Sequence, residues 1–237
     1  MVTTPVTLDA ETPLEAWQAG VTQLLNQGDS YNVITHIRRP LDFNLQGIKR
    51  INPRALSPKF PSTSDVINTI FPMKLWKGDR ADFYRDFLER NKRARGIHPR
   101  IKTRWGTYFE RMINFGDSHQ NQLEDCILAI NSWERNHCAA LVIHTSSCEV
   151  DSIRKIVGNP CLQYLEFICP TDNTVALSVV YRNHDYFGKV LGNFVGLAFL
   201  LNFIASQTAR TPDTLTCFAA HAYHESTKSN LRTLAGR

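Results

Sequence analysis

Apolar residues recur at helical spacing in some stretches of the chain and form short unbroken runs in others. Four of them, from Leu14 to Leu25, fall on one face of a helix that we predict over residues 13–28. Further helices are predicted over residues 65–76, 79–95 and 119–136. The polar, proline-marked residues 1–12 precede the first helix, and we predict a flexible amino-terminal tail there.

Runs rich in β-branched and aromatic residues predict strands in the second half of the chain. They cover residues 140–147, 162–169 and 174–183. The turn signal PTDN separates the last two runs and indicates that these strands pair. Nothing in the sequence suggests a second domain, so we predict a single domain over residues 1–237 that mixes helices and strands.

The longest apolar segment covers residues 190–209, and its length approaches that of a membrane span. Asn193, Asn202 and two glycines interrupt its apolar character, and no aromatic or basic anchors flank it. We therefore predict a fully buried core helix and no contact with a membrane.

The composition indicates a folded protein, and the charge favours anionic ligands. The formal net charge is +5, with 43% apolar and 21% charged residues. Much of the positive charge lies in residues 90–104, which we interpret as a solvated basic face, so nucleic acid is the least favoured partner. Six cysteines occur without a CxxC pair and the amino terminus lacks a signal peptide, so we predict reduced thiols in a cytoplasmic protein without a metal site.

Four short elements follow one another in the last third of the chain. They are NPC before a predicted strand, YRNHDYFG at the end of the next, LGN at the start of the apolar helix, and HAYHE near the carboxyl end. Their order and spacing resemble the thymidylate synthase and pyrimidine hydroxymethylase superfamily. RWGTYFERM upstream is similar to that family's Tyr-Gly-x-x-x-Arg segment. The resemblance implies an α/β (α+β) fold with a large mixed sheet flanked by helices, in a homodimer.

Cys161 is the candidate nucleophile. In the chemistry that the resemblance implies, a thiolate adds to C6 of a pyrimidine, so that C5 becomes an enolate carbon able to attack an electrophilic one-carbon unit. A thiol needs nearby positive charge to ionise at neutral pH, and Arg182 on the adjoining strand could supply it while also gripping a phosphate. Asn193 would act with Cys161 in catalysis by hydrogen-bonding the pyrimidine edge through its amide.

The other matching residues would bind the rest of the substrate and the donor. His221 and Tyr223 alternate along an extended segment, so their side chains share one face, and the resemblance implies that they hold the sugar hydroxyl. Asn183 takes the place of a serine that helps to bind phosphate. Asp185 matches the aspartate that contacts the pterin of the donor, which implies 5,10-methylenetetrahydrofolate as the cofactor.

The chain also departs from the family pattern. Ala139 and Ala140 replace paired arginines that bind phosphate. Losing two charge-assisted contacts, each worth about 1.5 to 3 kcal/mol, would weaken the binding of a nucleoside monophosphate. Asn68 is the nearest match to the catalytic glutamate and cannot shuttle protons as a carboxylate does. Because the sequence ends at Arg237, we expect a divergent, carboxyl-terminally truncated member without the family's final strands and lid.

Two function classes remain open on this sequence. The first is a one-carbon transferase that methylates or hydroxymethylates C5 of a pyrimidine nucleotide or nucleoside through Cys161. The second is a catalytically inactive relative that serves as a nucleotide-binding or assembly subunit, and the lost glutamate and lid favour it. A Cys161 sealed in apolar surroundings would exclude the first class.

Overall fold

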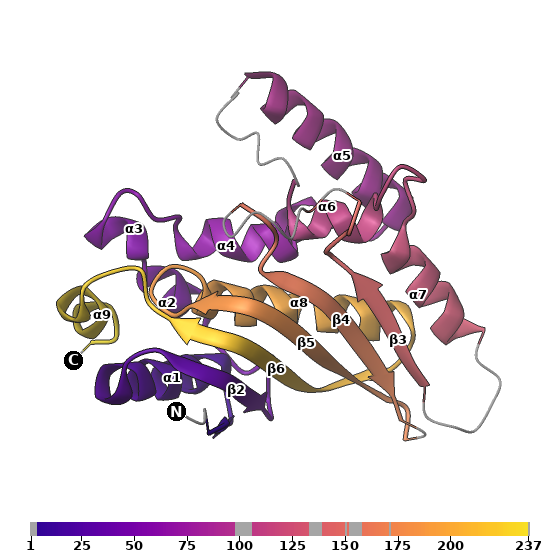
Figure 1. The fold of residues 1–237 in the computed structure, drawn as a ribbon. Coiled ribbons are helices and arrows are strands. Elements are labelled where there is room, and N and C mark those ends of the chain that lie inside the picture. Colours follow the sequence, from indigo (N-terminus) through magenta and orange to yellow (C-terminus); the bar gives the residue numbers. More distant parts are fainter. Residues whose placement is uncertain are drawn as a thin grey trace.

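The computed structural model describes residues 4–97, 106–132, 139–149, 151, 158–170 and 172–236. Within them, one mixed sheet has the strand order β1-β2-β6-β5-β4-β3. The strands are Val6–Ala10 (β1), Ser30–Ile37 (β2), Ala139–His144 (β3), Leu162–Cys169 (β4), Thr174–Asp185 (β5) and Thr211–Tyr223 (β6). β1 runs parallel to β2 and β5 parallel to β6, while the other neighbours are antiparallel. The predicted α/β fold with a mixed sheet flanked by helices is thereby confirmed (Figure 1).

The helices follow the sequence signals closely where those signals are strong. They are Pro13–Gln27 (α1), Leu45–Arg50 (α2), Pro53–Leu56 (α3), Thr63–Ile70 (α4), Arg80–Ile97 (α5), Tyr108–Ile113 (α6), Gln122–Asn131 (α7), Val190–Gln207 (α8) and Lys228–Leu234 (α9), with a 3-10 turn at Met73–Leu75 (η1). Thr12 caps α1, and Ser62 forms a capping box with Asp65 at the start of α4. α4 ends at Ile70, short of the predicted end at residue 76, because Pro72 cannot continue the helical hydrogen bonds.

The prediction of a flexible tail over residues 1–12 is wrong for the part of it that forms β1. Val6 pairs with Val33 of β2, and the strand continues in parallel register to Ala10. Val6, Leu8 and Ala10 pack against the core, while Thr7 and Asp9 between them are exposed. This period of two covers only five residues, and neighbouring polar residues concealed it in the sequence. Residues 1–3 lie outside the described part of the chain.

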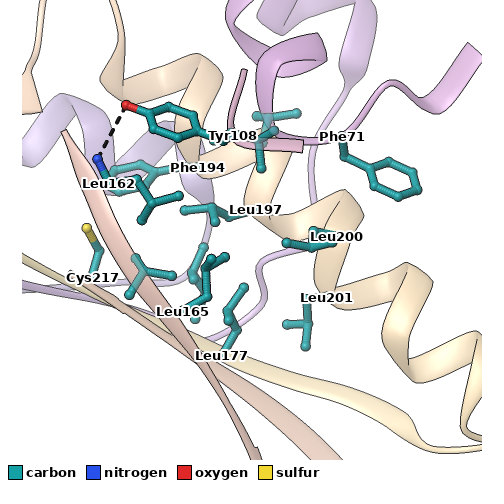
Figure 2. Packing of buried hydrophobic residues seen from close by; sticks show 14 of the residues in the cluster. Phe71, Tyr108, Leu162, Leu165, Leu177, Phe194, Leu197, Leu200, Leu201 and Cys217 are labelled. Atoms are coloured by element: carbon teal, nitrogen blue, oxygen red, sulfur yellow. Dashed lines mark hydrogen bonds between the residues drawn. The ribbon is translucent and has the colours of Figure 1, made fainter. Parts of the chain in front are cut away.

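α8 lies at the centre of the core. Leu197, Leu200 and Leu201 face Leu165 and Leu177 of the sheet (Figure 2). The helix is long and apolar enough to cross a membrane, with a mean hydropathy of 1.6, but 78% of it is buried inside the structure. Packing against the sheet therefore accounts for its apolar sequence.

The two faces of the sheet differ in how they are covered. Along β4, β5 and β6, alternate residues are buried in the core and the residues between them stay partly exposed. The strand register aligns a row of these partly exposed side chains, namely Ile34, Phe218, Val180 and Tyr164. We call this side the open face; in Figure 1 it lies toward the viewer, with α8 behind the sheet. An apolar surface is thus left at least partly uncovered by the described helices.

Two glycines of α8 let α4 approach it closely. A Cβ atom on Gly192 would lie 2.6 Å from Cβ of Val66 and 3.0 Å from the carbonyl oxygen of Thr63. A Cβ atom on Gly196 would lie 3.0 Å from Cβ of Ile70. Because such distances are shorter than normal contacts, the absence of side chains at these two positions sets the spacing of the two helices.

Replacing Gly192 should therefore destabilise the fold. We expect Gly192→Ala to lower the free energy of unfolding by about 1 to 3 kcal/mol, because the added methyl group overlaps Val66. Urea unfolding of the variant and the wild type measures this. Gly47→Ala in α2 is the matched control, since a Cβ atom there meets only Asn44, at 3.7 Å or more. Equal stability of the two variants would contradict the close approach of α4.

Candidate active site

A cavity of about 380 Å³ lies where the strand ends of the sheet meet the amino-terminal ends of α4 and α8. Its wall includes Cys161 just before β4, Asn183 and Asp185 at the end of β5, Asn193 in α8 and Tyr223 at the end of β6. The fold thus brings five of the predicted site residues, from four separate segments, around one space. Their chemical roles stay predictions.

Cys161 is half-buried and lines the cavity, so it is not sealed in the core. The hydroxyl group of Tyr108 in α6 accepts hydrogen bonds from the backbone N–H groups of Cys161 and Leu162, at 3.1 and 3.3 Å. Figure 2 shows the bond to Leu162. Tyr108 belongs to the RWGTYFERM stretch, and no sequence pattern predicted a contact between its hydroxyl and the backbone at Cys161. It fixes the backbone at the point where the loop enters β4.

Opposing effects act on the Cys161 thiol. Burial raises its pKa above the ordinary value of 9.0, while the charges of Arg182 and Lys189 favour the thiolate and lower it. The net direction is upward, so the thiol is mostly protonated at neutral pH. Arg182 lies beside the thiol as the sequence predicted, but burial raises the pKa of Cys161 by more than the charge of Arg182 lowers it.

Arg182 does not line the cavity, although it lies beside Cys161. Its Nε donates to the carbonyl oxygen of Pro160 at 3.1 Å, and its Nη2 donates to that of Asn159 at 3.2 Å. The guanidinium group therefore braces the NPC segment from the side. From this position Arg182 favours the thiolate form of Cys161 and holds the backbone of the NPC segment in place.

Asn193 is hydrogen-bonded to His184, a residue to which the sequence assigned no role. Asn193 Nδ2 and His184 Nε2 are 3.1 Å apart, and both side chains are buried at the edge of the cavity. Burial lowers the pKa of His184 to about 3, so the ring is neutral at physiological pH. His184 occupies the place that the family motif leaves unspecified, so no sequence signal pointed to it.

His221 lies beside the cavity and is not part of its lining. Its Nδ1 is 3.3 Å from Oδ1 of Asn183, and its Nε2 is 3.0 Å from Oδ2 of Asp29. The ring is stacked between those of Tyr31 and Tyr223, with centroids 5.0 and 4.9 Å away. Both ring nitrogens therefore have protein partners, and His221 reaches the cavity through Asn183 and Tyr223.

The carboxylate of Asp185 is engaged by the backbone. It accepts hydrogen bonds from the N–H groups of Phe187, Gly188 and Glu225, at 3.0 to 3.1 Å. These bonds tie the end of β5 to the turn before α8 and to the segment after β6. They fit a structural role, and none of them supports the predicted contact with a folate.

α4 presents Asp65 and Thr69 to the cavity. Asn68, the nearest match to the family's glutamate, is exposed and does not line the cavity, whereas Asp65 and Thr69 do. Asp65 and Thr69 are four residues apart and share one side of the helix. Glu225 adds a second carboxylate to the wall, and its Oε1 accepts a hydrogen bond from the Tyr223 hydroxyl at 2.9 Å. Both carboxylates were missed as site residues.

The basic stretch and the pair Ala139 and Ala140 fall partly outside the described residues. Nothing is described of residues 98–104 or of the side chain of Ala139. Ala140 lies on β3 opposite Ile168, so its place carries no charge. Lys189 is a cation in the cavity wall.

The balance of effects on Cys161 predicts its reactivity. We expect its alkylation by iodoacetamide to accelerate with pH and to continue accelerating above pH 9, because the thiolate fraction of a thiol with a raised pKa grows until that pKa is passed. Mass spectrometry of the Cys161 peptide gives the rate. Arg182→Met should slow the reaction at each pH, since it removes a charge that favours the thiolate. A rate that levels off below pH 9 would show that burial does not dominate.

Comparison with known proteins gives a distant match. No protein-family model matches the chain. A curated protein of Methanococcoides burtonii named "Putative thymidylate synthase" is 25% identical to it over 218 residues, which cover 91% of this chain and 88% of that protein. This similarity extends over nearly the whole fold, and it agrees with a divergent relationship to the thymidylate synthases of the kind that the motifs around Cys161 and Asn193 indicate.

Proposed function

We propose that this chain is a one-carbon transferase that methylates or hydroxymethylates C5 of a pyrimidine nucleotide or nucleoside. The observation that carries the proposal is that Cys161, Asn183, Asn193 and Tyr223 line one cavity, although they come from separate segments of the chain. The distant similarity to a curated protein named as a thymidylate synthase supports the same class of reaction.

The residues of the cavity fit the chemical steps as follows. The thiolate of Cys161 adds to C6, the C5=C6 electron pair moves toward C4, and the C4 carbonyl becomes an enolate. Asn193 offers an N–H donor and a carbonyl acceptor to the pyrimidine edge. C5 then attacks a one-carbon electrophile and loses its proton, and the donor nitrogen would leave with the electron pair of its C–N bond. Hydride from the reduced donor, for methylation, or water, for hydroxymethylation, would add to the resulting exocyclic methylene group as the C5=C6 bond re-forms and Cys161 leaves C6 as a thiolate. A donor of the 5,10-methylenetetrahydrofolate class would supply that electrophile.

Protons must move at two points in this scheme, and the cavity holds a group that can accept them. Glu225 lies in the wall, and its charge acts on the pKa of Cys161, so the two groups are within electrostatic reach. A carboxylate hydrogen-bonded to Tyr223 can take up a proton where Asn68 cannot. Glu225 is therefore our candidate for the proton acceptor, a role for which the sequence analysis found no residue.

The proposal covers nucleosides as well as nucleotides. Lys189 is a cation in the cavity wall that can face a phosphate, whereas Arg182 acts from beside the NPC segment. Ala140, however, brings no charge to a place where the family has an arginine. A weakened phosphate site widens the substrate class to ligands without that group.

A nucleotide-binding or assembly subunit is the second candidate function. The raised pKa of Cys161 favours it, because a protonated thiol is a poor nucleophile. This candidate shares the cavity and the pyrimidine ligand with the first. The two differ in whether a covalent bond to Cys161 forms.

Covalent adduct formation separates the two functions. The protein is incubated with 5-fluoro-2'-deoxyuridine or its monophosphate, with and without methylenetetrahydrofolate, and its intact mass is measured. We expect a mass increase that Cys161→Ser abolishes and Cys148→Ser, at an exposed cysteine, retains. Binding by calorimetry without any adduct would favour the binding subunit, and absence of both would contradict the two candidates together.

We also propose that two copies pair through the open face of the sheet. The row of Ile34, Phe218, Val180 and Tyr164 gives this face an apolar strip that crosses four strands. Ile34 is 37% exposed. Burying such a strip against its own copy removes apolar area from water, and a two-fold axis lets the same patch serve both partners.

A charge on the open face should break this dimer. We expect the wild type to have the mass of a dimer in size-exclusion chromatography with light scattering, and Ile34→Asp to shift it toward the monomer. Leu128→Asp is the matched control, because Leu128 is an exposed leucine on α7, 53% accessible. A monomeric wild type, or equal behaviour of the two variants, would rule out pairing through this face.

A further inference from the structure

We propose that His184 is a positioning residue that holds the amide of Asn193 in one orientation, so that the cavity selects uracil over cytosine. The inference rests on the proposed function, since it takes the pyrimidine to lie beside Cys161. It adds His184, which contacts Asn193 and not the base itself, as a determinant of substrate choice.

The ring of His184 is held in place by other aromatic rings. It is stacked on Tyr181 with the centroids 4.1 Å apart and the planes at 10°. The rings of Tyr186 and Phe194 lie edge-on at 5.9 and 5.6 Å. His184 is 1% exposed, so turning the ring over would disturb a packed core.

The contacts of the two ring nitrogens decide which of them carries the proton. The neutral ring has one N–H group. Nε2 faces the Nδ2 of Asn193 at 3.1 Å, and an amide nitrogen can only donate, so Nε2 accepts. Nδ1 therefore carries the proton and is directed toward Sγ of Cys217, 3.9 Å away.

This bond couples the orientation of the Asn193 amide to the tautomer of His184. While Nδ1 carries the proton, a reversed amide would place Oδ1 against the lone pair on Nε2, so reversal also requires the proton to move to Nε2 and away from the side that faces Cys217. The held orientation leaves one N–H group of Asn193 and its Oδ1 for a ligand. Among the described residues, none donates a hydrogen bond to that oxygen, and Asn193 lines the cavity.

The two pyrimidines differ in the order of donor and acceptor on the edge that Asn193 would meet. Uracil presents O4 as an acceptor and N3–H as a donor, whereas cytosine presents an amino group and an unprotonated N3. A fixed amide that pairs with one edge would set donor against donor and acceptor against acceptor on the other. Selectivity therefore depends on the amide being fixed.

The proposed reaction determines which edge fits. When the sulfur of Cys161 bonds to C6, the C5=C6 pair becomes a C4=C5 bond, and the carbonyl π pair moves onto O4 as negative charge. A hydrogen-bond donor facing O4 stabilises that charge, and a donor already held in position does so without reorganisation. The N–H group of Asn193 that His184 leaves free would then face O4, and Oδ1 would accept from N3–H.

The test compares the affinities for two nucleotides. Dissociation constants for 2'-deoxyuridine and 2'-deoxycytidine monophosphates are measured by calorimetry on the wild type, His184→Ala and Tyr181→Phe. The wild type should prefer the uracil nucleotide, and the ratio of the two constants should fall about tenfold in His184→Ala. Tyr181→Phe keeps the stacked ring and removes a buried hydroxyl that has no partner among the described residues, so it should retain the ratio.

A second measurement does not depend on the folding of a variant. Nitrogen-15 NMR of the wild type should show His184 with a protonated Nδ1 and an unprotonated Nε2, and a protonated Nε2 would overturn the proposal. An unchanged ratio in a folded His184→Ala variant would also overturn it and leave the proposed function standing. If neither nucleotide binds to the wild type, the proposed function fails and the inference falls with it.

Discussion

The carboxylate of Asp185 joins the segments that build the cavity. A buried carboxylate is costly unless hydrogen bonds satisfy it, and here three backbone N–H groups do so. Two of them belong to the turn before α8, and the third belongs to Glu225 after β6. The same bonds satisfy N–H groups that would otherwise lack partners at this junction. The amino-terminal end of α8, with Asn193, is thus fixed to the sheet at the end of β5, next to Cys161.

Burial sets the protonation of the side chains that point toward the core. It lowers the pKa of His184 and raises the pKa of Cys161, because both rest against apolar packing that disfavours charge. The charged groups near the cavity, such as Lys189 and Glu225, are exposed residues of its wall. Apart from the hydrogen-bonded carboxylate of Asp185, the cavity therefore combines a neutral, firmly packed inner side with a charged rim. Such a wall suits a ligand with a neutral ring and polar substituents.

The sequence predicted the parts of this arrangement that depend on local pattern. The paired strands β4 and β5, the buried helix α8 and the capped helices α1 and α4 all carry strong periodic or capping signals. β1 was missed because its apolar alternation is too short to stand out from a polar segment. His184 and Glu225 were missed for another reason: their significance comes from contacts with Asn193 and Tyr223, which only the tertiary fold creates. Asn68 was only the nearest sequence match to the family's glutamate, and the side of α4 that faces the cavity belongs to Asp65 and Thr69.

The stack of Tyr31, His221 and Tyr223 links the surface of the sheet to the cavity. Tyr31 lies on β2 and is 46% exposed, His221 lies opposite it on β6, and Tyr223 lines the cavity. Each ring in this stack limits the movement of the ring next to it. A contact that restricts the side chain of Tyr31 therefore also restricts the ring of His221. His221 is in turn hydrogen-bonded to Asn183 in the cavity wall. The geometry of the cavity wall at Asn183 and Tyr223 therefore depends on the sheet surface around Tyr31, whereas the geometry at Asn193 depends on the core around His184.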